Sequence, residues 1–418
     1  MFNLLSLLIA SILLACLPIY GINDNKIFII GGLVLLLGSL TIANYRDFKI
    51  KTNTISYIDC GVLFLLISCF IAFCASPFLN TSIKGLLKYV IYALYYICFL
   101  LLTKNQDNNK ILLYSCLIGC FWVCLEGLNQ VIFGAKELAT WSDPSIPAFE
   151  KLNRVYSTLL NPNLLAAYLL PFWGLCFYFA YKAFTDEKNI IKTFLFSIFA
   201  FLIIYLISQT GSRGAWLALM GQIGTIGLLL FIYLRSLPII FIMSFISISG
   251  IAYIFMKKAF LHRLMSIFTG YEDSSNSFRL HVWDACLKMF NDSIFFGIGP
   301  GSETFYLVYG AYMHSLYSSL GAYSLVLETA VETGLIGLTS LFILVIACIY
   351  SSLKYLKLAK HTKNKLFIII IFSGLVGWFL SGLFDIVILR PQIQIYIYLW
   401  LAILRNEFVK LKENLHNN

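Results

Sequence analysis

Three arginines lie at positions where a charged side chain is unusual in so hydrophobic a chain. Arg213 stands between Ser212 and Gly214 at the start of a hydrophobic segment, Arg154 lies between two such segments, and Arg279 lies in a predicted helix. Ser212 is suited to the N-cap position, which leaves backbone N–H groups beside a fixed positive charge. Helix N-termini bind phosphates, and a guanidinium can donate two parallel hydrogen bonds to phosphate oxygens. The alternative is that Arg213 is an anchor at the membrane interface. Gly211 and Gly214 on its two sides favour the close approach of a ligand, and therefore an anion site.

The helix around Arg279 is predicted from Phe278 to Phe290, directly after capping residues at Asp273–Ser277. Its apolar face holds Val282, Trp283, Cys286, Leu287 and Phe290, and its polar face holds His281, Asp284 and Lys288. Arg279 falls in the middle of the apolar arc. We expect this amphipathic helix to lie flat over the membrane surface with the guanidinium pointing inward. The alternative is an arginine that snorkels to lipid headgroups.

Acidic residues recur on one face of a later hydrophobic segment. Ser324, Glu328 and Glu332 are spaced four residues apart near its predicted outer end. Ionisable groups within a membrane span are functional candidates. The alternative is that Glu332-Thr333-Gly334 marks a helix kink, with the arginines satisfying both carboxylates. His314 precedes this cluster in the loop, where a lone histidine is more often incidental than catalytic.

Two other motifs have structural interpretations. The glycine-rich segment Phe296–Gly301 follows a predicted helix, and no Lys-Ser/Thr pair comes after it, so it is not a nucleotide-binding loop. We interpret it as a tight turn. Near the end of a later span, Asp385 and Arg390 are expected to pair with each other.

The composition defines the class of protein. The chain has 418 residues, of which 60% are hydrophobic and 12% charged, about half the charge of an average soluble domain. It is therefore an all-α integral membrane protein. The net charge of +10 is explained by basic cytoplasmic loops and calls for no nucleic-acid partner. Eleven cysteines contain no CxxC pair, so we expect neither a metal site nor a redox cofactor.

Hydropathy predicts about twelve transmembrane helices, since a span needs roughly 20 apolar residues. They fall near residues 2–20, 27–43, 56–76, 85–103, 111–133, 163–181, 193–208, 214–234, 237–256, 322–350, 366–388 and 393–404. The ninth and tenth are separated by a large loop, 257–320, which contains the short amphipathic helix. We divide the chain into one polytopic membrane domain, 1–405, and a tail, 406–418, that we expect to be frayed and solvated.

Loop charge predicts the orientation. Seventeen Lys and Arg residues fall in one set of alternate connections and in the C-terminal tail, against four in the short loops of the other side. The positive-inside rule then places both termini in the cytoplasm and the loops 134–161 and 257–320 outside.

Four segments resemble, in order and spacing, the O-antigen ligase and polymerase superfamily: Thr210–Ala215, Arg279–Trp283, Gly297–Gly301 and Glu332–Gly337. Asn153–Thr158 with Asn161–Asn163, and Ala322–Ser324 with Leu327-Glu328, are most similar to one branch, the cyanobacterial-type proteins described as inorganic-carbon (bicarbonate) transporters. The specific similarity covers about residues 150–345. It implies a bacterial inner or plasma membrane, cyanobacterium-like, or a plastid membrane.

Ligases of this superfamily transfer a glycan from an undecaprenyl diphosphate donor to a hydroxyl without a metal. The resemblance implies that Arg213 and Arg279 bind the diphosphate and stabilise it as the leaving group. Tyr323 and Ser324 stand where the ligases have a His-Asn pair, and a tyrosine with a pKa near ~10 is a poor base. Glu328 or His314 could take the place of that histidine.

Two functions follow from these residues. The first is metal-independent glycosyl transfer from a lipid-linked diphosphate glycan, with Arg213, Arg279 and Glu328 as catalytic residues. Arg154, Tyr323, Ser324 and His314 would complete the substrate site. The second is transport of a small anion such as bicarbonate by the same arginines. A structural membrane protein without turnover is a third possibility.

Overall fold

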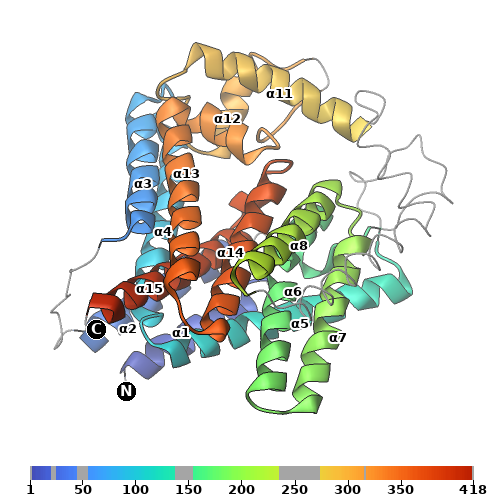
Figure 1. Ribbon diagram of the computed structural model, residues 1–418. Coiled ribbons are helices and arrows are strands. Elements are labelled where there is room, and N and C mark those ends of the chain that lie inside the picture. Colours follow the sequence, from blue (N-terminus) through green and yellow to red (C-terminus); the bar gives the residue numbers. More distant parts are fainter. Residues whose placement is uncertain are drawn as a thin grey trace.

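The computed structural model describes residues 2–19, 25–44, 55–136, 154–234, 274–314 and 317–416. These residues form thirteen α-helices and two short 3-10 helices, and no strand occurs among them (Figure 1). The all-α fold class predicted from composition is confirmed.

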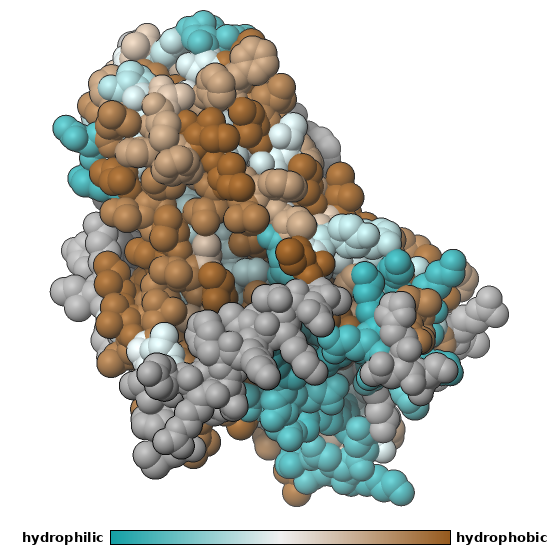
Figure 2. Space-filling view, turned by 90° about the vertical axis from the view of Figure 1, so that its left-hand side faces the viewer, coloured by the Kyte–Doolittle hydropathy of each residue, from teal (hydrophilic) through white to brown (hydrophobic). Residues whose placement is uncertain are grey.

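Eight of the described helices are long and apolar enough to cross a membrane. They are α3 (Tyr57–Ala75), α4 (Leu79–Leu102), α5 (Gln106–Phe133), α6 (Pro162–Thr185), α7 (Ile190–Gln209), α8 (Arg213–Tyr233), α13 (Leu325–Leu358) and α14 (Thr362–Gly382). The exposed side chains of α3 include Leu63, Phe64 and Phe70, and the face of the molecule on that side is largely hydrophobic (Figure 2). The chain is therefore a multi-pass membrane protein.

The other predicted spans have different outcomes. Residues 2–20 and 27–43 correspond to α1 (Phe2–Cys16) and α2 (Asn25–Asn44), whose apolar segments are shorter. The predicted span 237–256 lies outside the described residues. The last predicted span lies within α15 (Pro391–His416), which is not among the eight.

The tail expected to fray after residue 405 continues as part of α15 through His416. Phe408 is 1% exposed, because this end of the helix packs against α4. Its polar groups are also satisfied: Asn406 Nδ2 donates to Thr103 Oγ1 at 2.7 Å, and Arg405 pairs with Asp59 at 3.0 Å. The hydropathy of the tail gave no sign of these contacts.

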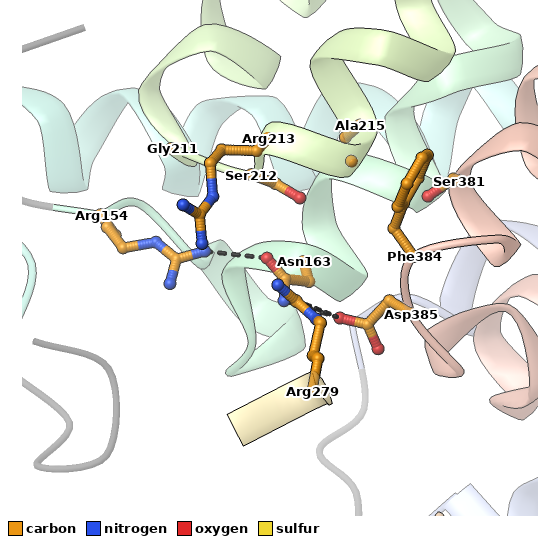
Figure 3. Close-up of a pocket in the computed structure, with 11 residues that line it drawn as sticks. Arg154, Asn163, Gly211, Ser212, Arg213, Ala215, Arg279, Ser381, Phe384 and Asp385 are labelled. Atoms are coloured by element: carbon orange, nitrogen blue, oxygen red, sulfur yellow. Dashed lines mark hydrogen bonds and ion pairs between the residues drawn. The ribbon is translucent and has the colours of Figure 1, made fainter. Parts of the chain in front are cut away.

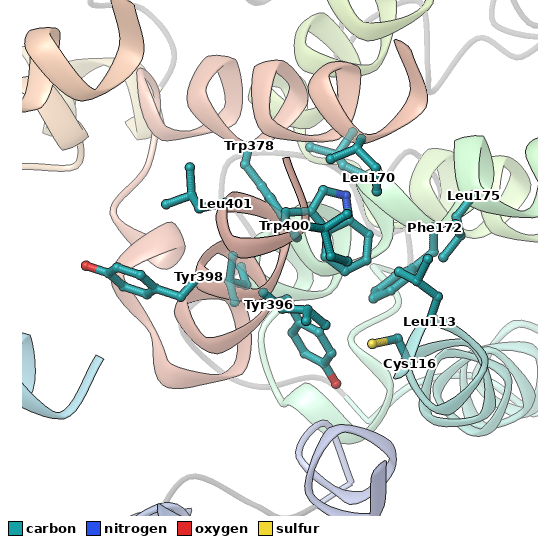
Figure 4. Close-up of a cluster of buried hydrophobic side chains, with 14 of the residues drawn as sticks. Leu113, Cys116, Leu170, Phe172, Leu175, Trp378, Tyr396, Tyr398, Trp400 and Leu401 are labelled. Atoms are coloured by element: carbon teal, nitrogen blue, oxygen red, sulfur yellow. The ribbon is translucent and has the colours of Figure 1, made fainter. Parts of the chain in front are cut away.

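A core of aromatic rings joins α6, α14 and α15 (Figure 4). The centroid of the Trp400 ring lies 5.5 Å from that of Trp378 and 5.9 Å from that of Phe172. Trp378 Nε1 donates to the carbonyl of Ala167 at 2.9 Å, which fixes α14 against α6. Dense packing and such polar contacts hold helices together in lipid. The core therefore fixes the ends of α6 and α14, which carry part of the site described below.

A loop domain lies over one end of the bundle. It consists of α11 (Ser274–Asp292), α12 (Ser302–Tyr309) and their connections through residue 324, without 315–316 (Figure 1). Val282 and Cys286 of α11 are buried as predicted, but they pack with Phe305 of α12 and Val331 of α13 in a second core. The expectation that this face lies on the membrane surface is wrong, because the chain covers it with its own apolar residues. Leu287, predicted on the same face, is 51% exposed.

Helix α13 is broken at Gly334, where φ is 64° and ψ is −161°. The segment Ile294–Gly299 binds the broken turn: Ile298 N–H and Gly299 N–H donate to the carbonyls of Val331 and Glu332, both at 3.0 Å. In return Leu335 N–H donates to the carbonyl of Ile294 at 2.7 Å, and Ile336 N–H to that of Phe295 at 3.4 Å. We call these four bonds the clasp. The predicted kink is confirmed, and the glycine-rich turn is one half of the clasp.

The two carboxylates beside the break bind backbone N–H groups. Glu332 Oε1 accepts from Gly301 N–H at 2.8 Å, and Glu328 accepts from Ala322 N–H. The expectation that arginines satisfy them is wrong, because the loop domain itself presents donors to both. Glu328 and Glu332 thus tie two turns of the loop domain to α13.

The glycine at the break can be tested by substitution. A Cβ at Gly334 would overlap the Phe295 carbonyl, and a φ of 64° with a ψ of −161° costs an L-residue roughly 1–3 kcal/mol before any overlap. Gly334→Ala should therefore lower the midpoint of thermal unfolding in detergent by several degrees. Gly224→Ala is the matched control, since nothing lies within 4 Å of its Cβ. Equal midpoints for the two variants would contradict the clasp.

Candidate functional site

The three arginines singled out in the sequence line one pocket at the junction of the bundle and the loop domain (Figure 3). Its volume is about 30 Å³, room for one or two water molecules. The start of α6, the turn before α8 and the end of α14 supply one wall, and α11 supplies Arg279. The lining residues are Arg154, Asn163, Gly211, Ser212, Arg213, Gly214, Ala215, Arg279, Ser381, Phe384 and Asp385.

The N-terminus of α8 points into this pocket. Ser212 takes the predicted N-cap position, but its side chain makes no capping hydrogen bond. Gly211 has a φ of +63°, which lets the chain turn sharply from α7 into α8. Gly214 lies close to the Phe384 side chain, so this glycine accommodates a ring of the protein rather than a ligand. The positive end of the helix dipole and the buried Arg213 side chain both favour an anion here.

Hydrogen bonds hold Arg154 in the pocket wall. Its Nε donates to the carbonyl of Thr210 at 2.8 Å, and its Nη2 donates to Asn163 Oδ1 at 2.8 Å. The Asn163 side chain is not needed to cap α6. Asn161 does so, because its Oδ1 accepts from the backbone N–H groups of Asn163 and Leu164. The predicted turn and helix start at Asn161–Asn163 is confirmed.

Asp385 is the counter-charge of the pocket. Its Oδ2 accepts a hydrogen bond from Asn163 Nδ2 at 2.7 Å and lies 3.9 Å from Arg279 Nη2. The partners of Asp385 are therefore Asn163 and Arg279, and not Arg390 as predicted. Three arginines and one aspartate leave a formal charge of +2 on the lining. Sequence reasoning missed Asn163 and Asp385 as site residues; their only signals were a helix start and a carboxylate just beyond a span.

Tyr323 lies next to the pocket in a strained conformation. Its φ is +52°, which is rare for a bulky residue and is found at functional sites. Its phenol is within electrostatic range of Arg279 and Asp385; burial first, and then the charge of Asp385, raises its pKa. The hydroxyl is thus protonated at neutral pH and can donate a hydrogen bond.

The remaining predicted residues do not line the pocket. Ser324 is the buried N-cap residue of α13 and makes no side-chain capping bond. Glu328 is buried with its carboxylate against Ala322. His314 lies beside the polar face of α11, where its Nε2 is 2.9 Å from Asp284 Oδ2. The structure thus brings together Arg154, Arg213 and Arg279 and separates them from these three.

Comparison with known families gives one match: a family model described as O-antigen ligase matches residues 198–342. None of the curated proteins matches the chain. The matched segment contains α8, α11, α12 and the part of α13 that includes the break. Arg213 and Arg279 lie within it, whereas Arg154, Asn163 and Asp385 lie outside it. It supports the O-antigen ligase superfamily and does not distinguish its ligases from the branch described as inorganic-carbon transporters.

Removal of the counter-charge should strengthen anion binding. Asp385→Asn raises the formal charge of the lining from +2 to +3, so pyrophosphate should bind roughly tenfold more tightly at low salt. The measurement is the pyrophosphate-dependent rise in melting temperature. Asp107→Asn, at an exposed pair with Lys110, should leave that rise unchanged. A weaker response from Asp385→Asn than from wild type would contradict the electrostatic role.

Proposed function

We propose that this protein binds a polyprenyl-diphosphate-linked glycan at the arginine pocket and transfers the glycan to an acceptor hydroxyl. The proposal includes the predicted orientation, with the loop domain outside a bacterial plasma membrane or plastid membrane and both termini in the cytoplasm. One observation carries it: guanidinium groups from three separate segments line one pocket at the N-terminus of a helix.

The charge of the pocket fits this substrate class. A diphosphate with an ester at each end has one negative charge on each phosphate, and the lining has a formal charge of +2. Arginine is the side chain best suited to bidentate contacts with phosphate. Because the pocket holds only one or two waters, the diphosphate would bind at its mouth, where it would take the place of the Asp385 carboxylate beside Arg279.

In the proposed transfer, the acceptor oxygen attacks the anomeric carbon of the glycan. The carbon–oxygen bond to the diphosphate breaks, and the bonding electrons leave with the phosphate. Arg213 and Arg279 stabilise the charge that grows on that oxygen, which is where preorganised donors lower a barrier most. Tyr323 donates a hydrogen bond to the leaving diphosphate.

The proton of the acceptor hydroxyl needs a base. Among the described residues that line the pocket, Asp385 is the only one with a carboxylate. Displaced from Arg279 by the diphosphate, it would be free to accept the proton. Glu328 was predicted to be catalytic, but its position favours a structural role. Its carboxylate accepts a hydrogen bond from Ala322 N–H and so holds the turn that sets the conformation of Tyr323.

Transport of a small anion such as bicarbonate is the competing function. A monovalent anion would leave one positive charge of the lining uncompensated, whereas the diphosphate compensates both. The same arginines would serve in either case, so the two functions are separated by product formation and not by the loss of activity alone.

Substitution of the arginines tests the transferase. Arg213→Ala and Arg279→Ala should each lower transfer from undecaprenyl diphosphate–glycan roughly 10²–10³-fold, the loss typical for one oxyanion-stabilising donor. Lys84→Ala is the control, because Lys84 is exposed, pairs with Glu303 and does not line the pocket. The assay uses purified protein in lipid with donor and acceptor. Absence of any product from wild type, together with arginine-dependent uptake of bicarbonate into vesicles, would reject the transferase.

Substitution of Tyr323 tests the assignment of the base. Since its raised pKa keeps the phenol protonated, wild-type transfer should show no rise caused by Tyr323 between pH 7 and 9. Tyr323→His introduces a group that titrates near pH ~6.5 and should add a pH dependence between about 6 and 7, with transfer increasing as the imidazole becomes neutral. Tyr312→His, elsewhere in the loop domain, is the control. If the wild-type rate of transfer instead rises with pH towards the pKa of a phenol, and the rate of Tyr323→Phe does not change with pH, Tyr323 is the base.

A further inference from the structure

Five rings follow one another along one side of the loop domain. The ring centroid of Tyr323 is 5.4 Å from that of Phe278, and Phe278 is 6.0 Å from Tyr317. Tyr317 lies 4.3 Å from His281, which lies 5.1 Å from His314. We call these five residues the aromatic row.

The aromatic row begins at the arginine pocket. Phe278 directly precedes Arg279 on α11, and Tyr323 lies within electrostatic range of Arg279 and Asp385. At its far end His314 Nε2 is 2.9 Å from Asp284 Oδ2, and Lys288 Nζ is 2.8 Å from the same oxygen. A path of rings therefore connects the proposed phosphate site to an exposed polar cluster.

The exposure of the row distinguishes it from the core beneath it. Phe305 and Tyr309 of α12 form the core of the loop domain and are 0% and 1% exposed. Phe278, His281, Tyr317 and Tyr323 are only half-buried, and the His314 side chain is 43% exposed. Phe278 and Tyr323 pack against that core with one part of each ring and leave another part open. The row thus presents ring surface together with imidazole, carboxylate and ammonium groups.

Such a surface fits a carbohydrate. A pyranose has a C–H face that stacks on aromatic rings and a rim of hydroxyls that bind carboxylate, imidazole and ammonium groups. Specific sites of this kind combine aromatic walls with a few polar groups that fix orientation. The polar face predicted for α11, with His281, Asp284 and Lys288, thereby acquires a role that packing did not give it.

We infer that the aromatic row binds the sugar units of the lipid-linked donor, with the first sugar at Tyr323 and Phe278 and later ones towards His281 and His314. This inference rests on the proposed function, which supplies the diphosphate anchor at Arg279. It assigns glycan recognition to the loop domain and phosphate recognition mainly to the bundle.

Two probes separate these contributions: undecaprenyl diphosphate, and the same lipid carrying N-acetylglucosamine. In nanodiscs, wild type should bind the sugar-bearing lipid about tenfold more tightly, a difference of ~1.4 kcal/mol. Tyr317→Ala and His281→Ala should lose that preference without losing affinity for the sugar-free lipid, and Tyr317→Trp should keep it. Tyr312→Ala is the control, because Tyr312 is a half-buried ring of the same domain that hydrogen-bonds Asp292 and lies off the row.

The outcomes distinguish the two proposals. Equal affinity of wild type for both lipids would overturn the aromatic row as a glycan site and leave the diphosphate site standing. Failure to bind either lipid would reject the proposed function. The row would then be judged with free chitobiose by saturation-transfer NMR: a signal in wild type that Tyr317→Ala abolishes supports it, and no signal overturns it. Melting temperatures within a few degrees of wild type confirm that each variant is folded.

Discussion

The clasp at the break in α13 is the interaction on which the arrangement of the site depends. An interrupted helix leaves backbone donors and acceptors that lipid cannot satisfy, and each costs several kcal/mol if it stays unpaired. Here the freed carbonyls of Val331 and Glu332 and the freed N–H groups of Leu335 and Ile336 all find partners in the segment Ile294–Gly299. The loop domain is thus bound to the bundle by its backbone, and α11 is held where Arg279 reaches the pocket.

The site is shared between these two parts of the chain. The bundle supplies Arg154, Asn163, Arg213 and Asp385, whose positions depend on the packed ends of α6, α8 and α14, whereas the loop domain supplies Arg279 and Tyr323. Asp385 bridges the parts, since it contacts Asn163 in one and Arg279 in the other. In the proposed function, a ligand that displaces this carboxylate also replaces one of the contacts between bundle and loop domain.

The elements could be predicted from the sequence more fully than the site. Hydropathy and capping residues identified the eight long apolar helices, the start of α6, the helix around Arg279 and the kink at Gly334, because these depend on local sequence. The three arginines were grouped on one side of the membrane, and they line one pocket. Asn163 and Asp385 could not be found this way, because their contact joins residues that are distant in the sequence. Hydropathy also cannot tell an apolar face covered by protein from one covered by lipid, which is why the apolar face of α11 was assigned to the membrane surface.

The clasp consists of main-chain atoms alone, and this has a consequence for how such a protein can diverge. The four bonds specify a backbone path and the glycines that permit it, but no side-chain chemistry. Substitutions can therefore accumulate on the exposed surface of the loop domain while these bonds, and the Glu328 and Glu332 contacts beside them, persist. In such a protein, the ligand specificity of the loop domain can change during evolution while the fold stays the same.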